Sequence, residues 1–315
     1  MREGGNAGEA QPSKAFARLG LPGNLTGVTK AADVTAAAAG TITLGSDLEV
    51  RRMGYGAMRI TGEGIWGEPP DAEAAKQVLR RALELGVNFI DTADSYGPEV
   101  SERLIAEALH PYPDDLVIAT KGGLLRSGPG GWEPDGRPEH LREACEGSLR
   151  RLRLDRIDLY QLHRPDPDVP LEESVGAIAE LRAEGKIRHV GLSNVAEEQV
   201  GRAREIVPVV SIQNRYSVAE RDSDPLVDLC ERDGLAFIPW FPLVAGWISE
   251  HAGPWDRAAR AHEARQAQIA LAWLLHRSPA MLPIPGTSSV AHLEENVAAA
   301  GLRLSDDEYE ALAAA

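Results

Sequence analysis

Two aspartates and a tyrosine follow a short apolar run in the segment GVNFIDTADSYG, residues 86–97. The run at 87–90 suits a buried strand, but nothing in sheet packing calls for Asp91 or Tyr96 at its end. An ionised carboxylate in apolar surroundings needs a partner of opposite charge. Lys121 ends the next apolar run along the chain, so we expect it to be that partner.

These side chains together suit acid–base chemistry. An ammonium beside Tyr96 lowers the pKa of the phenol from its ordinary value of about 10 and makes it a usable proton donor at neutral pH. His163 ends a third apolar run, LYQLH, and we expect it to orient a carbonyl oxygen against the Tyr96 hydroxyl. Asp94 receives no role beyond capping or bracing the loop. A lone lysine or histidine at a strand end is usually structural, so the hypothesis depends on the whole set.

A regular alternation of apolar runs and helical stretches must position this set. Residues 41–50 predict a small hairpin that turns at Gly45–Asp47, ahead of the first core strand. We predict eight strands, within residues 51–58, 88–93, 116–121, 157–163, 189–194, 209–214, 235–240 and 281–286. We predict helices over residues 71–86, 101–110, 138–152, 171–185, 197–207, 224–234, 265–277 and 291–301.

Alternating strands and helices predict a parallel sheet with helices outside it. Eight such units favour an α/β fold of the (β/α)8 TIM-barrel type with an N-terminal β-hairpin cap. A doubly wound sheet is disfavoured, because GYGAM is too short for the GxGxxG turn that follows its first strand. We expect one domain at 39–315 after a flexible extension at 1–38. In such a barrel, chemistry gathers where the strands end, and that is where the set lies.

Composition excludes several classes of function. The formal net charge of −15 argues against a nucleic-acid partner, which needs clustered Lys and Arg. Cys145 and Cys230 lie far apart and are expected to be core thiols in a reducing compartment. No apolar run is long enough for a membrane span, and residues 1–14 lack the apolar stretch of a signal peptide. We therefore expect a cytoplasmic protein with no membrane partner and no metal site.

Five segments in this order resemble the aldo-keto reductase superfamily: GVNFIDTADSYG, VIATKGG, DLYQLHRPD, GKIRHVGLSN and PIPGTSSVAHLEENV. The resemblance covers roughly residues 42–312. It implies reduction of an aldehyde or ketone by hydride transfer from NADPH. It assigns Tyr96 as the general acid, Lys121 as the residue that tunes it, Asp91 as the holder of the lysine, and His163 as the residue that positions the carbonyl.

The resemblance also implies a dinucleotide that lies extended across the barrel mouth. It places Trp240 against the nicotinamide ring, where a flat side chain stacks. Polar side chains would hold the carboxamide, and the first and seventh strand ends would contact the remainder. These residues are Ser193, Asn194 and Gln213 for the carboxamide, Gly56, Ala57 and Met58 on the first strand, and Pro242 and Leu243 beside the pyrophosphate.

The adenosine end would lie on the turn GTSSV and the helix after it, whose free N–H groups suit a phosphate. The sequence departs from the family there, since Gly286 replaces a common lysine and His292 stands where an arginine is usual. We still expect NADPH, with some use of NADH left open. The residues implied at this end are Gly286, Thr287, Ser288, His292, Glu295 and Asn296.

Tryptophans are expected to line the substrate pocket. Trp66, Trp132 and Trp247 fall on strand exits or the loops after them, as does Trp255, and such a mouth suits an apolar or aromatic carbonyl substrate. The physiological substrate and the oligomeric state are left open. Two alternatives also remain: an aldolase-type barrel in which Lys121 forms a Schiff base, and a cofactor-binding regulatory or sensor barrel with little turnover.

Overall fold

A curled parallel sheet forms the centre of the protein. The computed structural model describes residues 34–243 and 252–315. Seven strands pair side by side in the order β11-β10-β9-β8-β5-β4-β3. They are β3 (Tyr55–Gly56), β4 (Phe89–Asp91), β5 (Val117–Gly122), β8 (Ile157–Leu162), β9 (Ile187–Ser193), β10 (Val209–Gln213) and β11 (Ala236–Phe237).

The eighth predicted strand is an irregular segment that nevertheless closes the barrel. Pro283 and Pro285 have no N–H to donate, so this segment cannot make a full ladder. On one side, Phe237 N donates to Ala280 O at 2.9 Å and Leu282 N donates to Phe237 O at 2.9 Å. On the other side, Gly54 N donates to Pro283 O at 3.0 Å. The predicted barrel is therefore confirmed, with a seam in place of one regular strand.

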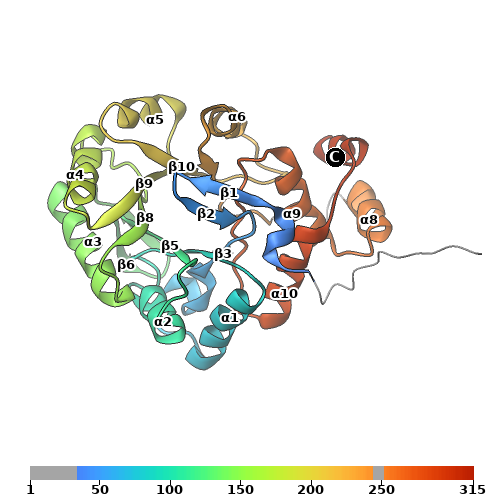
Figure 1. The fold of residues 1–315 in the computed structure, drawn as a ribbon, viewed down its shortest axis with the longest axis horizontal. Helices are drawn as coiled ribbons and strands as arrows, with labels where there is room; N and C mark the ends of the chain where they lie inside the picture. Colours follow the sequence, from blue (N-terminus) through green and yellow to red (C-terminus); the bar gives the residue numbers. More distant parts are fainter. Residues whose placement is uncertain (1–33, 244–251) are drawn as a thin grey trace, which may run out of the picture.

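Helices surround the sheet as a ring (Figure 1). The predicted helices are all present, with cap chemistry at several ends: Asp71 accepts from Ala74 N at 2.9 Å, and Gly234 ends its helix with a φ of 69°. They are α1 (Ala72–Glu84), α2 (Val100–Leu109), α3 (Pro138–Leu152), α4 (Leu171–Ala183), α5 (Glu197–Arg204), α6 (Asp224–Asp233), α9 (Gln266–Arg277) and α10 (Val290–Ala298).

Several elements were not predicted. Helices α8 (Ala252–Ala261) and α11 (Asp306–Ala313) pack on α9 and lie outside the ring in Figure 1. An antiparallel hairpin of β6 (Leu124–Gly128) and β7 (Gly131–Pro134) follows β5. Short 3-10 turns complete the fold at Ala36–Ala39, Ala57–Ile60, Glu63–Ile65 and Ala299–Gly301.

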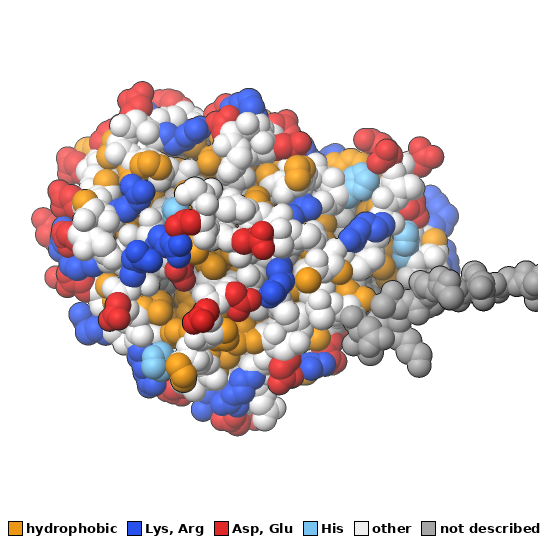
Figure 2. Space-filling model, in the orientation of Figure 1, with side chains coloured by type: hydrophobic (Ala, Val, Ile, Leu, Met, Phe, Trp, Pro, Cys, Tyr) orange, Lys and Arg blue, Asp and Glu red, His pale blue; other side chains and the backbone are white. Residues whose placement is uncertain are grey.

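The predicted hairpin cap is confirmed. Strands β1 (Thr41–Leu44) and β2 (Leu48–Arg51) lie across the middle of the ring in Figure 1 and pair with Leu44 opposite Leu48. In its turn, Asp47 accepts from Arg188 Nη2 at 2.7 Å and contacts His189 Nε2 at 2.6 Å. On this face of the molecule, acidic and basic side chains are interspersed (Figure 2).

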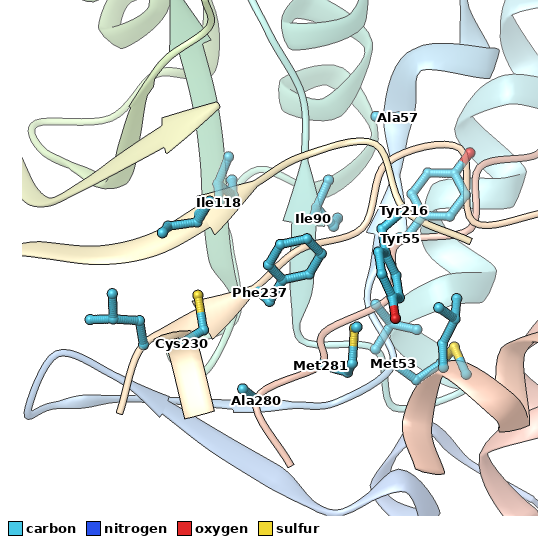
Figure 3. Packing of buried hydrophobic residues seen from close by; sticks show 14 of the residues in the cluster. Met53, Tyr55, Ala57, Ile90, Ile118, Tyr216, Cys230, Phe237, Ala280 and Met281 are labelled. Atoms are coloured by element: carbon cyan, nitrogen blue, oxygen red, sulfur yellow. The ribbon is translucent and has the colours of Figure 1, made fainter. Parts of the chain in front are cut away.

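The strands bury side chains on both faces, in two separate apolar layers. Inside the barrel, Phe89, Ala119 and Leu159 pack with Leu44 and other hairpin residues. Between sheet and helices lies a larger layer, part of which Figure 3 shows, where Tyr216 and Phe237 meet edge to face with ring centroids 5.5 Å apart. Successive side chains of a strand alternate between the two layers, which decides what can face the barrel interior.

The start of the folded part differs from the expected boundary at residue 38. Ala36 is fully buried and Ala39 nearly so, in the layer between sheet and helices. Ala36 N also donates to Leu85 O at 2.9 Å. These residues therefore belong to the barrel domain, whereas most of the expected extension, residues 1–33, lies outside the described residues. No helix within residues 34–243 and 252–315 has the length and apolar character to span a bilayer.

Candidate active site

A buried polar network lies where the strands end, above the apolar interior. The alternation of side chains points Asp91, Lys121, Gln161 and Gln213 from four strands to the barrel interior. Asp91 Oδ1 accepts from Lys121 Nζ at 2.6 Å. Its other oxygen, Oδ2, accepts from Gln213 Nε2 at 2.8 Å and from Gln161 Nε2 at 3.1 Å. The carboxylate is thus held by one cation and two amides.

Lys121 links this network to Tyr96. Its ammonium, fully buried, donates to Thr92 O at 2.7 Å and lies 3.5 Å from Tyr96 Oη. Burial lowers the pKa of Lys121, but the attraction of Asp91 and then of Tyr96 outweighs it, and its pKa is raised. Because a Schiff-base lysine must be neutral to attack a carbonyl, this environment argues against the aldolase alternative.

The pKa of Tyr96 departs from the sequence-based expectation. Lys121 does lower the pKa of the phenol, as expected, but burial raises it by more, so that its pKa is raised overall. Tyr96 is 7% exposed, so the hydroxyl has lost most of its contact with water. The expected net lowering of the Tyr96 pKa was therefore wrong. A raised pKa keeps the phenol protonated, as a proton donor must be.

His163 lies next to Tyr96, with ring centroids 5.8 Å apart and nearly perpendicular planes. Its pKa is well below the ordinary value, because of burial first and then of the positive charges of Lys121, Arg164 and Arg126. The ring is therefore neutral at neutral pH. Ser95 Oγ lies 3.4 Å from Nδ1, which leaves Nε2 for a substrate oxygen.

Two of the predicted pocket tryptophans lie near these residues. Trp132, on β7, has its ring centroid 6.4 Å from that of Tyr96 and 6.4 Å from that of His163. Trp66 is 36% exposed, on a loop whose neighbour Gly67 donates from N to Gly97 O at 2.7 Å. Trp247 lies outside the described residues. The expected loop position of Trp255 was wrong, because it is fully buried within α8.

A cavity of about 440 Å³ opens beside Tyr96 and Asp91. Of the described residues that line it, only Arg59 carries a permanent positive charge. Sequence reasoning missed Arg59, Phe241, Ile284 and Pro285 on its wall, although all but Ile284 are next in sequence to a site residue that it named. Besides Asp91 and Tyr96, the predicted residues that line the cavity are Gly56, Met58, Gln213, Trp240, Pro242, Leu243 and Gly286. The other predicted residues in the described part of the chain do not line it, among them Ala57, Lys121, His163, Ser193, Asn194, Trp66 and Trp132.

Gly286, the position of the missing lysine, admits no side chain without a backbone shift. A Cβ atom there would lie 2.7 Å from Gly56 O, and a Cβ at Gly56 would lie 2.6 Å from Ile284 O. The first strand and the seam thus meet backbone to backbone at the wall of the cavity. Arg59 follows the end of the same first strand, and its guanidinium offers the positive charge that residue 286 cannot supply.

The turn after Gly286 is held in place by its own hydroxyls and by the first strand. Tyr55 Oη donates to Thr287 O at 2.6 Å, and Ser289 N donates to Thr287 Oγ1 at 3.0 Å. Ser289 Oγ then caps α10 by accepting from His292 N at 3.4 Å. Of the remaining predicted residues, Ser288 and His292 are exposed, Glu295 pairs with Arg265 at 3.0 Å and Asn296 is buried.

The expected carboxamide residues are adjacent at the ends of β9 and β10. Asn194 has a φ of 57° and donates from N to Gln213 O at 3.0 Å. Its Nδ2 donates to His163 O at 2.9 Å and to Ser193 Oγ at 3.0 Å. Gln213 uses its Nε2 on Asp91, and no hydrogen bond within the described residues uses its Oε1. At the cavity, Gln213 therefore offers one free acceptor that suits the amide N–H of a nicotinamide carboxamide, whereas the amide donors of Asn194 and Gln213 are already engaged within the protein.

Two features of the site had no sequence-based assignment. Gln161 was not singled out, although alternation along LYQLH points it, like His163, into the barrel. Asp94 proves to be 9% exposed, with no hydrogen-bond partner for Oδ1 among the described residues. Burial, and next the charge of Glu102, raises the pKa of Asp94 to about 8. It lines a second cavity, with His140 and Arg151, behind the Tyr96 loop.

Comparison with known proteins extends over nearly all of this domain. A sequence model of the Aldo/keto reductase family matches residues 52–315. An uncharacterized oxidoreductase of Schizosaccharomyces pombe is 52% identical over 279 residues, which are 89% of this chain and 90% of that protein. Pyridoxine 4-dehydrogenase of Escherichia coli is 45% identical over 274 residues, which are 85% of this chain and 95% of that enzyme.

Solved structures agree with these sequence matches. The glycerol dehydrogenase of Gluconobacter oxydans matches with a TM-score of 0.80 and 28% identity over 87% of this chain and 94% of its own. An aldo-keto reductase of Klebsiella pneumoniae, solved in complex with NADPH, matches with a TM-score of 0.71 and 26% identity over 86% of this chain and 93% of its own. The barrel, the arrangement at its mouth and these matches lead to one conclusion: the chain belongs to the aldo/keto reductase family of oxidoreductases.

Proposed function

We propose that this protein reduces an aldehyde or ketone to an alcohol with NADPH and that Tyr96 donates the proton. The observation that carries the proposal is the position of Lys121, whose Nζ lies 2.6 Å from Asp91 Oδ1 and 3.5 Å from Tyr96 Oη, beside an open cavity. This is the geometry of a proton donor whose conjugate base is stabilised by a fixed cation.

Each residue has a distinct part in this chemistry. NADPH, when bound, supplies the hydride. Tyr96 transfers its hydroxyl proton to the carbonyl oxygen, and Lys121 stabilises the phenolate that is left. Asp91 keeps the lysine charged, while the neutral ring of His163 donates from Nε2 to the same carbonyl oxygen and orients it. The apolar walls of the cavity keep water from these groups.

The preference for NADPH has support from the mouth of the barrel and from a relative. Arg59 offers a cation at the cavity wall, and the N-terminus of α10 with Ser288 and His292 offers polar groups to a phosphate. The Klebsiella pneumoniae protein was solved with NADPH. Because neither Gly286 nor His292 supplies a strong cation, we infer that NADH is also used, at lower affinity.

We further infer an aromatic aldehyde as the substrate. Trp132 lies edge-on to Tyr96 and would stack on a planar ring held there. The Escherichia coli relative is a pyridoxine 4-dehydrogenase, and the aldehyde that corresponds to pyridoxine is pyridoxal. Pyridoxal is therefore the first compound to test, beside simple aromatic aldehydes.

The experiment follows the loss of reduced-cofactor absorbance with NADPH and with NADH across this panel. We expect Tyr96→Phe to lower turnover by about 10²- to 10⁴-fold while NADPH still binds. Tyr112→Phe is the matched control, because that hydroxyl donates to Leu152 O at 2.7 Å, on the outer wall of the barrel. Turnover that survives in Tyr96→Phe would contradict the role of Tyr96. NADPH binding without turnover of any carbonyl would favour the sensor alternative.

A further inference from the structure

Arg126 binds three loops at the substrate side of the mouth through main-chain oxygens alone. Arg126 lies on β6, and its guanidinium has five N–H groups. Every one of its nitrogens donates to a backbone carbonyl. The acceptors are Gly131 O for Nε at 2.9 Å, Ile65 O and Ser95 O for Nη1 at 2.9 and 3.0 Å, and Gly64 O and Gly128 O for Nη2 at 3.1 and 3.3 Å.

These acceptors are neutral, so the positive charge of Arg126 stays uncompensated. In the part of the chain that the structure describes, no Asp or Glu forms an ion pair with it, whereas Lys121 has Asp91 at 2.6 Å. Burial lowers the pKa of Arg126 below its ordinary value, and the nearby Tyr96 offsets only part of this. An arginine nonetheless keeps its charge at any physiological pH.

An aromatic ring connects this charge to the reaction site. The guanidinium carbon lies 3.6 Å from the ring centroid of Trp132 and 5.6 Å from that of Trp66. Trp132 in turn lies edge-on to both Tyr96 and His163, with centroids 6.4 Å apart in each case. Arg126 is therefore one ring away from the place where a carbonyl must sit.

The titratable groups next to Tyr96 and His163 do not cancel the charge, although Glu99 and Glu143 line the second cavity together with Arg126; Glu99 pairs there with Arg151 at 3.0 Å. Asp91 is paired with Lys121, His163 is neutral, and Asp94, with a pKa of about 8, holds a proton at neutral pH. The positive charge of Arg164 adds to that of Arg126 at His163. A chain with a net charge of −15 thus carries an arginine without an ion-pair partner, among the described residues, beside its substrate site.

We propose that the stack of Arg126 on Trp132 makes this site selective for planar aromatic carbonyl compounds that bear a negative charge, such as a ring carboxylate. The inference rests on the proposed carbonyl reduction and specifies its substrate class. Because all its donors are occupied, Arg126 acts through its charge and its support of the ring, not as a hydrogen-bonded clamp.

The test compares 4-carboxybenzaldehyde with its neutral methyl ester as substrates. We expect kcat/KM to favour the carboxylate by roughly tenfold at low ionic strength, an advantage that added salt reduces. Arg126→Met should abolish the preference, mainly through KM. Arg126→Lys keeps the charge but not the five donors, so it should retain the preference at lower activity with both substrates.

Arg232→Met is the matched control, because that exposed arginine pairs with Asp233 on α6, far from the mouth. It removes one positive charge and should leave the preference unchanged. Equal losses with both substrates in Arg126→Met, or no preference in the unaltered protein, would overturn the inference and leave Arg126 a purely structural residue.

A second measurement separates this inference from the proposed function. If the protein reduces none of the carbonyl compounds, the proposed function is wrong. The preference for a negatively charged ligand is then tested by binding alone. Benzoate and methyl benzoate would be titrated against tryptophan fluorescence in the presence of NADPH. Tighter binding of benzoate that is lost in Arg126→Met supports a positively charged aromatic site, and equal binding of the two compounds overturns it.

Discussion

The two ends of the barrel are built from the same strands but are filled by opposite chemistry. At the end that β1 and β2 close, Leu44 and Val50 are fully buried against apolar strand residues. At the mouth, the same strands end in Asp91, Lys121 and other polar side chains that are just as buried. The closed end needs only good packing. The mouth needs each buried charge to be paired or hydrogen-bonded, and the same polar groups also make it reactive.

The largest effect is expected where the mouth loses a charge partner. Lys121→Met leaves the Asp91 carboxylate buried with only the amides of Gln161 and Gln213, which should lower the free energy of unfolding by about 3–5 kcal/mol. Urea denaturation at neutral pH measures this loss. Carbonyl reduction should disappear as well.

The double variant Lys121→Met with Asp91→Asn sharpens this comparison. It removes both charges, so most of the lost stability should return while activity stays absent. If the single variant Lys121→Met proved as stable as the unaltered protein, the Lys121–Asp91 ion pair would not be needed for the stability of the mouth.

A cavity at the closed end should reduce stability without touching the chemistry. Leu44→Ala removes a fully buried side chain and is expected to lower the free energy of unfolding by about 2–5 kcal/mol. NADPH affinity and kcat should stay unchanged, because the hairpin lies at the opposite end of the strands. A fall in cofactor affinity that parallels the loss of stability would break the distinction between the two ends.

Asp94 extends the comparison to pH. Its pKa rises from 3.8 to about 8 on folding, so between these values the folded protein holds a proton that the unfolded chain has released. Stability should therefore fall as pH rises through this window, by up to ~1.4 kcal/mol per pH unit. Asp94→Asn removes that dependence. The stability of this variant relative to the unaltered protein should therefore be greater at the upper end of the window than at the lower end.

Thermal unfolding at both ends of the window measures this difference. Asp114→Asn, at an exposed position, is the control and should show no such trend. An equal effect of Asp94→Asn at both pH values would mean that Asp94 is ionised in the folded protein.

The smallest effect is expected at the turn of the hairpin. Asp47 is 45% exposed, and its ion pairs with Arg188 and His189 should contribute only about 0–1 kcal/mol. Hydrogen bonds from Arg188 and then His189 lower its pKa, so the contribution is present at neutral pH and is lost as the pH falls below the ordinary range of an aspartate. Denaturation of Asp47→Asn with and without added salt measures it. A loss comparable to that of Leu44→Ala would show that charge, not packing, holds the cap in place.

Alternation and cap chemistry were enough to predict the barrel, the hairpin cap and the strand ends that carry Asp91, Lys121 and His163. The eighth strand was expected to be regular, although Pro283 and Pro285 already indicated a segment that cannot form a ladder. Helix α11 had a readable signal as well, since Ser305 and Glu308 form a capping box.

Other features depend on packing that no local pattern shows. The net direction of the Tyr96 pKa follows from how completely the fold buries the hydroxyl, which spacing along the chain does not specify. The contacts of Arg126 join residues from loops far apart in sequence, such as Gly64 and Gly131. Likewise, the exclusion of a side chain at Gly286 appears only once the first strand lies against the seam.

The seam also has a consequence for the order in which the protein folds. Arg52 Nε donates to Met281 O at 3.1 Å, a contact between residues 229 positions apart in the chain. Closing so long a loop delays such contacts relative to local ones. Gly56 on the first strand and Gly286 at the end of the seam segment both line the cavity. We therefore expect the cofactor cavity to be among the last parts of the molecule to assemble, after nearly the whole chain has been synthesised.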